Sequence, residues 1–387
     1  MQIEDLALQR SKYKHLSDDE WRWFLQQVEG KERTADKLPT FAAIENWWYP
    51  VRLSCEQCSS ELAARYKAEI VESQKSKDES RFADLTGGYG VDTYFLSENF
   101  AHTDYVEQNA ELCRIAEHNF ALMVIGERRK VNVHHSSAED FLASAGQYDL
   151  IFLDPARRDS HGGKVFRLED CTPNVVEVLP TLLAHGKRVM LKLSPMLDLT
   201  QAVNKLQSDN VQGTNWDIYV VAIKNEVKEV LLLSGGTGQI TAIDLGKKDQ
   251  AFVFTKEEEQ NCSLEIGDWK LENYLYEPNA AILKAGAYKL VAERFGLHKL
   301  DVNTHLYCSE ELVSDFPGRV WRIKPTPSLP KGKELCQANV LTRNYPLTPE
   351  QLKKKLHLRD GGTVFVIGCR VAGKPTLFFA ERFEDIH

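Results

Sequence analysis

The fold of this chain is decided by a stretch at residues 82–92, Phe82-Ala83-Asp84-Leu85-Thr86-Gly87-Gly88-Tyr89-Gly90-Val91-Asp92. A short apolar strand leads here into a glycine-rich turn, and a helix-length segment follows. Glycine has no Cβ and can adopt positive φ, so the backbone amides of such a turn and the N-terminus of the helix can approach a ligand closely. The stretch therefore predicts either a site for a nucleotide-like cofactor or simply a tight turn.

Short apolar runs alternate with helix-length segments from residue 81 onward. Strands are predicted at residues 82–85, 102–107, 131–134, 148–154 and 188–193, with the clearest helices at 91–98 and 110–123. This alternation predicts a parallel sheet covered by helices on both faces. Two further runs, 217–224 and 227–233, are joined by only two residues, which is too short for a parallel crossover. The sheet is therefore predicted to end in an antiparallel hairpin.

Acidic residues follow the second and third predicted strands. Glu107 ends the second strand, 17 residues past Gly90, and is followed by Gln108. A carboxylate at that strand end can accept hydrogen bonds from both hydroxyls of a ribose. After the third strand, Glu139 and Asp140 would be placed to receive an adenine amino group. They would equally suit the first turn of a helix that a serine caps, and the two interpretations are compatible.

The fourth predicted strand ends at Asp154, which begins the run Asp154-Pro155-Ala156-Arg157-Arg158. In open α/β sheets, ligands bind in the crevice outside the carboxyl ends of the strands, where this aspartate would lie. An Asp-Pro turn can also be purely structural. Because it falls in register with the glycine turn and with Glu107, we favour a functional role.

These motifs resemble those of the class I S-adenosylmethionine-dependent methyltransferases, over residues 80–234. Residues 84–90 match the family's first motif, Glu107 its ribose-binding acid, and residues 154–157 its fourth motif. The resemblance implies an α/β fold with a seven-stranded, doubly wound, Rossmann-like sheet that ends in a hairpin, and S-adenosyl-L-methionine as the cofactor. The residues implied to bind that cofactor are Asp84, Thr86, Gly87, Gly88, Gly90, Asp92, Glu107, Gln108, Glu139 and Asp140.

A narrower resemblance covers the second half of the chain. The runs at residues 277–279, 285–287 and 317–319, with the basic tail, are similar to a bacterial family of predicted RNA methyltransferases whose C-terminal domain is described as THUMP-like. This resemblance implies that the chain acts on structured RNA, either tRNA or rRNA. It is less specific than the first, because it does not rest on catalytic chemistry.

The fourth motif departs from that of the nucleic-acid amino methyltransferases, which is Asp/Asn-Pro-Pro-aromatic. In those enzymes the acid or amide and a backbone carbonyl hold the exocyclic amine while the aromatic ring stacks on a flipped base. Here Ala156 replaces the second proline and Arg157 the aromatic residue, and an arginine can stack on a base or bind a phosphate. We expect methyl transfer to a base nitrogen, with Asp154 and Pro155 holding the acceptor and Arg157 and Arg158 positioning base or phosphate.

Other acceptor atoms have other requirements. A uracil carbon needs a cysteine nucleophile after the fifth strand, and the chain has none there, so this chemistry is disfavoured. A ribose 2′-oxygen is the alternative, because Asp154, Lys192 and Glu229 occupy places similar to three members of the Lys-Asp-Lys-Glu tetrad of ribose 2′-O-methyltransferases. In that chemistry a lysine helps to deprotonate the hydroxyl. Lys75 or Lys77 would supply the first lysine, and Lys192 could instead form a structural ion pair.

Charge is distributed unevenly along the chain. The net charge is −8, which by itself argues against a nucleic-acid partner, but residues 320–387 contain twelve Lys or Arg and six Asp or Glu. An acidic body with a basic tail is one pattern that indicates a nucleic-acid arm, although the three consecutive lysines could form only a solvated helix face. The predicted RNA-binding residues are Arg158, Lys331, Lys333, Arg343, Lys353, Lys354, Lys355, Arg370 and Lys374.

The length of 387 residues allows several domains. We expect an N-terminal helical region at 1–79, a cofactor-binding methyltransferase domain at 80–236, a connecting segment and small α+β, ferredoxin-like module at 237–322, and a basic THUMP-like domain at 323–387. The first region would contain helices from Ser17 and Ser60, the latter with Leu62, Tyr66 and Ile70 on one face. The aromatic run at 47–49 would pack against a neighbouring domain or stack on bases.

The later segments are less regular in sequence. The chain is predicted to be irregular after Gly236, to form a helix at 277–295 and strands at 305–308 and 319–323, and to end in two strands at 363–371 and 376–382. Thr348 and Pro349 would begin the last helix.

No apolar run approaches the roughly 20 residues that span a bilayer, and the first residues lack the apolar stretch of a secretory signal, so a cytoplasmic protein is expected. Cys55 and Cys58 have zinc-knuckle spacing without a second ligand pair, so no metal site is expected. Two other classes remain open. The glycine turn and Glu107 alone would permit an NAD-dependent oxidoreductase, and a methyltransferase fold can also belong to a non-catalytic RNA-binding protein.

Overall fold

The computed structural model describes residues 6, 9–72, 79–123, 130–156, 168–208, 214–246, 251–263, 266, 273–324 and 337–383. The chain forms two compact units. The first consists of residues 1–217 with 229–237, and the second of residues 218–228 with 238–387. No helix in the described ranges has both the length and the apolar character that a membrane span requires.

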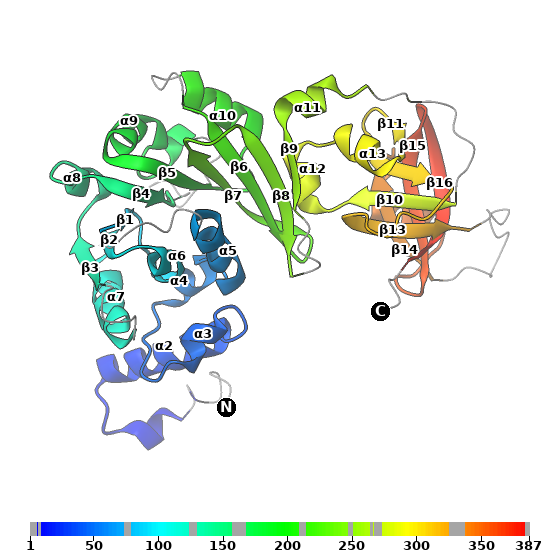
Figure 1. Ribbon diagram of the computed structural model, residues 1–387. Helices are drawn as coiled ribbons and strands as arrows, with labels where there is room; N and C mark the ends of the chain where they lie inside the picture. The colour runs from blue at the N-terminus through cyan, green and yellow to red at the C-terminus, as the bar shows by residue number, and fades with distance from the viewer. Residues whose placement is uncertain are drawn as a thin grey trace. The chain divides into compact units, whose positions relative to one another are not determined.

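A nine-stranded, mostly parallel sheet has the strand order β3-β2-β1-β4-β5-β7-β6-β8-β9 (Figure 1). The five predicted parallel strands are present. The two strands of the predicted hairpin, β6 and β7, are neighbours in the sheet, and β7 also pairs antiparallel with β5. The strands are β1 (Arg81–Asp84), β2 (His102–Glu107), β3 (Lys130–His135), β4 (Tyr148–Leu153), β5 (Gly186–Leu193), β6 (Trp216–Ile223), β7 (Glu226–Ser234), β8 (Gln239–Leu245) and β9 (Phe252–Thr255).

The expectation of seven strands is wrong, because β8 and β9 lie in the stretch that we expected to be irregular. Gly235 and Gly238 both have positive φ and turn the chain immediately before β8. The last five residues of β8 are buried, and the strand runs parallel to β6. Because β8 lies between β6 and β9, it continues the sheet beyond the predicted hairpin.

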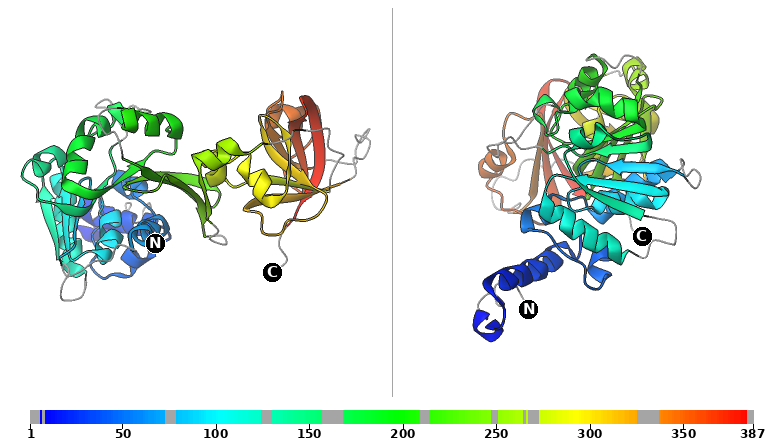
Figure 2. Two further views of the ribbon diagram at one scale, coloured as in Figure 1. Left: turned by 45° about the horizontal axis from the view of Figure 1, so that its top comes forward. Right: turned by 90° about the vertical axis from the view of Figure 1, so that its left-hand side faces the viewer.

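Helices cover both faces of the sheet in the first unit, as predicted. Figures 1 and 2 show α5, α6 and α7 on one face and α8, α9 and α10 on the other. The helices are α5 (Glu61–Glu72), α6 (Val91–Leu96), α7 (Ala110–Leu122), α8 (Ala138–Leu142), α9 (Val175–His185) and α10 (Leu199–Ser208), with short 3₁₀ turns η2 (Ser97–Asn99) and η3 (Leu168–Asp170). The central strands between these layers are buried on both sides, which is typical of parallel sheets.

The N-terminal region is helical and packs on the glycine turn. It contains η1 (Arg10–Tyr13), α2 (Asp18–Thr34), α3 (Pro39–Ala43) and α4 (Arg52–Gln57), and Ser17 forms the expected capping box at α2. Trp47 and Tyr49 are buried in one core with Tyr89 and Phe95. The indole of Trp47 donates a hydrogen bond to the Tyr89 hydroxyl at 3.0 Å. For these two aromatic residues the packing interpretation is confirmed.

The second unit contains a seven-stranded, mostly antiparallel sheet of order β11-β12-β10-β13-β16-β15-β14. The predicted helix at 277–295 is two helices, because Gly286 adopts a left-handed conformation and ends the first. Thr348 and Pro349 begin the last helix as expected. The elements are α11 (Lys256–Asn261), β10 (Tyr274–Pro278), α12 (Ala280–Ala285), α13 (Leu290–Phe295), β11 (His298–Asp301), β12 (Thr304–Ser309), β13 (Gly318–Ile323), β14 (Asn339–Arg343), α14 (Pro349–Lys355), β15 (Val364–Val371) and β16 (Lys374–Arg382).

Candidate active site

The turn between β1 and α6 requires glycine at three positions. Gly88 and Gly90 have φ of 55° and 81°, in the left-handed region that favours glycine. A Cβ on Gly87 would lie 2.1 Å from the ring of Tyr105, which lies on β2. The turn is therefore held tightly against the neighbouring strand, with α6 beginning directly after it.

Glu107 lies at the carboxyl end of β2 and faces this turn. Its Oε2 accepts a hydrogen bond from the Gly88 amide at 2.9 Å, and its Oε1 accepts one from the Asn109 amide at 2.8 Å. Gln108 is exposed, and its carbonyl is 2.9 Å from the His135 ring. The acidic side chain is thus fixed beside the glycine turn, at the strand end where the sequence predicts a ribose-binding acid.

Glu139 and Asp140 lie in the exposed first turn of α8. The Asp140 amide donates to the Ser137 hydroxyl at 3.0 Å, and that hydroxyl donates to Asp140 Oδ2 at 2.8 Å. The helix-capping interpretation of this segment is therefore correct. The side chain of Glu139 is exposed.

Asp84 stabilises the start of the glycine turn from inside. Its Oδ1 accepts from the Thr86 amide at 3.0 Å, and its Oδ2 accepts from the Thr93 hydroxyl at 2.5 Å. Burial raises the pKa of this carboxyl to about 7, against the two hydrogen bonds. Thr86 Oγ1 in turn accepts from the Asp154 amide at 2.6 Å, so the glycine turn is joined to the corner after β4.

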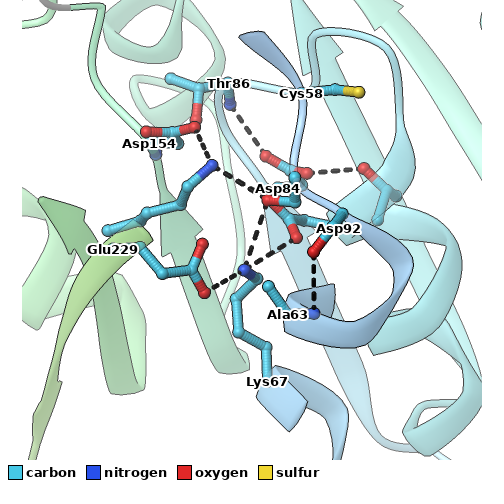
Figure 3. Close-up of polar contacts among 12 residues, drawn as sticks. Cys58, Ala63, Lys67, Asp84, Thr86, Asp92, Asp154 and Glu229 are labelled. Atoms are coloured by element: carbon cyan, nitrogen blue, oxygen red, sulfur yellow. Dashed lines mark hydrogen bonds and ion pairs between the residues drawn. The ribbon is translucent and has the colours of Figure 1, made fainter. Parts of the chain in front are cut away.

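Five charged residues meet beside that corner, and we call them the buried charge cluster (Figure 3). Lys192 Nζ lies 2.6 Å from Asp154 Oδ2 and 3.4 Å from Asp92 Oδ2. Lys67 Nζ lies 3.1 Å from Asp92 Oδ1 and 2.5 Å from Glu229 Oε1. The five come from α5, α6, β5, β7 and the end of β4, so the cluster depends on the whole first unit being folded.

Asp154 is the most exposed member of the cluster. Its side chain is 27% exposed, whereas those of Lys67 and Lys192 are 0% and 5% exposed. Burial would lower the pKa of Lys192, but the carboxylates of Asp154, Asp92 and Glu229 together raise it above its usual range. Lys192 is therefore an ammonium group at neutral pH, and it points its charge at the most accessible carboxylate.

Burial raises the pKa of both innermost carboxyls, but the charges of the lysines offset this rise to different degrees. It raises the pKa of Glu229, and the charge of Lys67 only partly offsets this effect. The pKa of Asp92 is lowered on balance, because the charges of Lys67 and Lys192 outweigh its burial. Asp92 is consequently the carboxylate that both lysines keep ionised.

Comparison with solved structures identifies the relatives of the chain. The chain is similar to the crystal structure of a "putative methyltransferase" from Porphyromonas gingivalis W83, with 32% sequence identity and a TM-score of 0.81. The match covers 95% of this chain and 92% of the P. gingivalis chain. The chain belongs to this methyltransferase family. The recognition of an S-adenosylmethionine-dependent methyltransferase with a THUMP-like C-terminal domain is thereby confirmed.

Family models match the second unit of this methyltransferase. Residues 274–317 match a ferredoxin-like domain, and residues 318–382 match a domain described as THUMP domain-like. Other solved structures are similar over part of the chain. One is a SAM-dependent methyltransferase from Agrobacterium tumefaciens, with 16% identity and a TM-score of 0.32, and the match covers 44% of this chain and 59% of that chain. An rRNA methylase from Streptococcus thermophilus has 12% identity over 44% of this chain and 94% of its own, with a TM-score of 0.34. No curated protein matches the chain.

Lys67, on α5, is a residue of the site that sequence reasoning missed. Asp154, Lys192 and Glu229 are brought together as the tetrad alternative requires, and Lys67 lies with them. Lys75 and Lys77, which we expected to supply the first lysine, lie outside the described residues. The signal for Lys67 is its spacing, since it lies four residues from Ala63 and four from Val71, both of which are buried.

Asp92 has a different environment from the one expected of a cofactor-binding residue, since its carboxylate faces the two lysines. Pro155 is buried, while Arg157 and Arg158 lie outside the described residues. Within the described residues no group of three or more potential metal ligands occurs. Cys55 and Cys58 donate instead to backbone carbonyls.

The predicted RNA-binding residues fall into four groups. Arg343 forms an ion pair with Glu277, and Lys353 one with Asp360, so these two are engaged within the protein. Arg370 donates to a backbone carbonyl in the β15–β16 turn. The exposed residues are Lys354, Lys355 and Lys374, and Arg158, Lys331 and Lys333 lie outside the described residues.

Proposed function

We propose that this methyltransferase transfers a methyl group from S-adenosylmethionine to structured RNA, and that the acceptor is a ribose 2′-hydroxyl. The observation that carries the choice of atom is Lys67. With it, two lysines, Asp154 and Glu229 lie together at the carboxyl end of the sheet, which is the residue set of the ribose tetrad. The base-nitrogen acceptor that the sequence favours uses only the Asp154-Pro155 corner and gives the buried lysines no role.

The residues of the glycine turn fit a nucleoside cofactor. Gly87 packs on Tyr105 and leaves no space for a side chain, so the backbone itself forms the surface beside Glu107. Glu107 would accept hydrogen bonds from the ribose hydroxyls, and the segment of Glu139 and Asp140 would lie on the adenine side. S-adenosylmethionine supplies an electrophilic methyl group on a sulfonium, and S-adenosylhomocysteine is left when the S–C bond breaks.

Asp154 is suited to take the proton of the acceptor. As the oxygen–carbon bond forms, the hydroxyl proton passes to the Asp154 carboxylate, which faces solvent on one side and Lys192 on the other. Lys192 is held as an ammonium group, so it orients Asp154 and does not itself serve as the base. Alignment of acceptor and methyl carbon would supply most of the rate enhancement.

RNA is supported as the partner by the second unit. Its residues 318–382 match the THUMP domain-like model, and Lys354, Lys355 and Lys374 on this part of the chain are exposed. Such residues would add sequence-independent affinity for phosphates. The nucleotide chosen for methylation would be set by residues nearer Asp154.

The test is methyl transfer to RNA from cells that lack the gene, followed by alkaline hydrolysis. A 2′-O-methyl group blocks cleavage, so label is expected in dinucleotides, whereas a methylated base would appear in mononucleotides. Lys67→Met and Asp154→Asn should each lower the rate about 100-fold or more. Lys187→Met is the matched control, because Lys187 is exposed on the same strand as Lys192.

The outcomes separate the alternatives. Label in mononucleotides would refute the ribose acceptor and restore the base nitrogen. Absence of label from RNA would refute the RNA substrate. Calorimetry with S-adenosylhomocysteine and NAD tests the cofactor, since tighter binding of NAD would indicate an oxidoreductase.

A further inference from the structure

Asp92 connects the glycine turn with both buried lysines. It lies in the first turn of α6, two residues after Gly90. Its Oδ1 is 3.1 Å from Lys67 Nζ, and its Oδ2 is 3.4 Å from Lys192 Nζ. One carboxylate thus lies in contact with two like charges that would otherwise repel each other in a buried site.

Ser59 completes this connection. Its hydroxyl donates to Asp92 Oδ2 at 2.7 Å, and it accepts from Lys192 Nζ at 3.1 Å and from Lys67 Nζ at 3.3 Å. A hydroxyl has one proton to donate and two lone pairs to accept with, and Ser59 uses all three. Asp92 therefore fixes the orientation of the Ser59 hydroxyl, and Ser59 and Asp92 together fix the positions of both ammonium groups.

The lysine positions determine in turn where Asp154 points. Lys192 Nζ donates to Asp154 Oδ2 at 2.6 Å, which is shorter than its 3.4 Å contact with Asp92. Lys67 is held by Glu229 and Asp92. A chain of contacts hence runs from the glycine turn through Asp92 to Lys192 and then to Asp154.

We infer that Asp92 and Ser59 are positioning residues, which hold the ammonium groups of Lys67 and Lys192 and through Lys192 aim the Asp154 carboxylate at the acceptor. The inference rests on the proposed function for the meaning of that aim. It also assigns Asp92 a role other than contact with the cofactor. Because Asp92 lies in the first turn of α6, directly after the glycine turn, it fixes the acceptor side of the site relative to that turn.

The first test is kinetic. Asp92→Asn and Ser59→Ala should lower kcat by about 10- to 100-fold, as is usual when a residue that orients a catalytic group is lost. The KM for RNA and the affinity for S-adenosylhomocysteine should change little. Asp104→Asn and Ser97→Ala are matched controls, because both residues are buried in the same unit and bond outside the cluster.

The pH profile of kcat distinguishes positioning from a merely structural role of Asp92, because a structural role would leave the profile unchanged. Asp92→Asn removes one of the negative charges that keep Lys192 protonated, so the alkaline limb of the kcat profile should move to lower pH, and Asp92→Glu should restore it. The titratable groups that face Lys192 are Asp154, Asp92, Glu229 and Cys58, with Lys67 across the shared Ser59 hydroxyl.

A measurement independent of RNA keeps the two proposals apart. The ¹⁵Nζ signals of Lys67 and Lys192 should be visible as ammonium in the wild-type protein, should shift when S-adenosylhomocysteine binds, and should be lost or displaced in Asp92→Asn. Unchanged signals and an unchanged alkaline limb in this variant would overturn the inference, even with methyl transfer intact. Failure of the wild type to methylate RNA would overturn the proposed function, while the signals would still decide the role of Asp92.

Discussion

Replacing Lys67 with methionine perturbs the buried charge cluster at its least accessible point. The side chain is 0% exposed, and its Nζ lies 2.5 Å from Glu229 Oε1 and 3.1 Å from Asp92 Oδ1. Methionine keeps a similar length without the charge. The variant leaves Lys192 as the one cation among three carboxylates of the cluster.

The expected loss of stability is large. Removing one partner of a buried ion pair typically costs about 3–5 kcal/mol, because the other charge stays buried and unpaired. For a folding unit of this size, about 2–4 °C of Tm is lost per kcal/mol, which gives a decrease of roughly 6–20 °C. In the double variant Lys67→Met/Glu229→Gln the unpaired charge is absent too, so at least half of the loss should be recovered.

The loss should also depend on pH. Burial raises the pKa of Glu229, and removing Lys67 takes away the charge that opposes this rise. A carboxyl whose folded pKa exceeds its unfolded pKa takes up a proton on folding, so its ionisation destabilises the fold increasingly as pH rises. The deficit of Lys67→Met should therefore be smaller at pH 5 than at pH 8.

Thermal unfolding of the wild type, the two single variants and the double variant at both pH values is the assay. Lys187→Met serves as the control, because that lysine is 72% exposed and its pair with Asp149 should contribute little. Additive effects of the Lys67 and Glu229 changes, with the same deficit at both pH values, would refute the ion pair as the source of the effect.

Three further predictions concern other residues. Burial raises the pKa of Asp84 from 3.8 to about 7, so the free energy of unfolding of the wild type should fall by about 4 kcal/mol as the pH rises from 3.8 to 7, and that of Asp84→Asn should lack this decrease. A difference in stability between the two proteins that stays constant with pH would contradict this. Gly87→Ala places a Cβ 2.1 Å from the Tyr105 ring and should cost about 1–3 kcal/mol and abolish S-adenosylhomocysteine binding, measured by calorimetry; normal binding would show that the turn is not the cofactor site. Lys354→Glu with Lys355→Glu should reduce the salt dependence of RNA binding by about one unit of slope per lysine, with paired Lys353 as the control, and an unchanged slope would place the RNA surface elsewhere.

The sheet of the first unit could be predicted because its signals are local. Each parallel strand is a short apolar run between helix-length segments, and the two-residue connection before β7 excludes a crossover. The strand β8 was missed since it follows closely spaced glycines and contains the polar Thr241 and Asp244. Asp244 accepts hydrogen bonds from the Asn225 amide, a tertiary contact that no sequence pattern reveals.

The site could be predicted only where it is built from strand ends. Glu107, Asp154 and Lys192 follow from the rule that carboxyl ends of parallel strands meet at one edge. Lys67 comes from a helix before the sheet, and it is not on the face of Leu62, Tyr66 and Ile70 that the sequence suggests. Leu62 on that face is exposed. The rotation of a helix with apolar residues on two faces is decided by its neighbours. The face that packs is formed by Ala63, Ala64, Lys67 and Val71.

The border between the two family matches in the second unit falls between residues 317 and 318, at the start of β13. That strand pairs over five residues with β10 from the ferredoxin-like part, and Leu275 and Trp321 share one core with Ile367 from the THUMP-like part. Two sequence modules thus form one cooperative folding unit. Exchange of the tail alone, as a way to change the substrate, would cut through a hydrogen-bonded sheet, so the two modules have to be expressed and exchanged together.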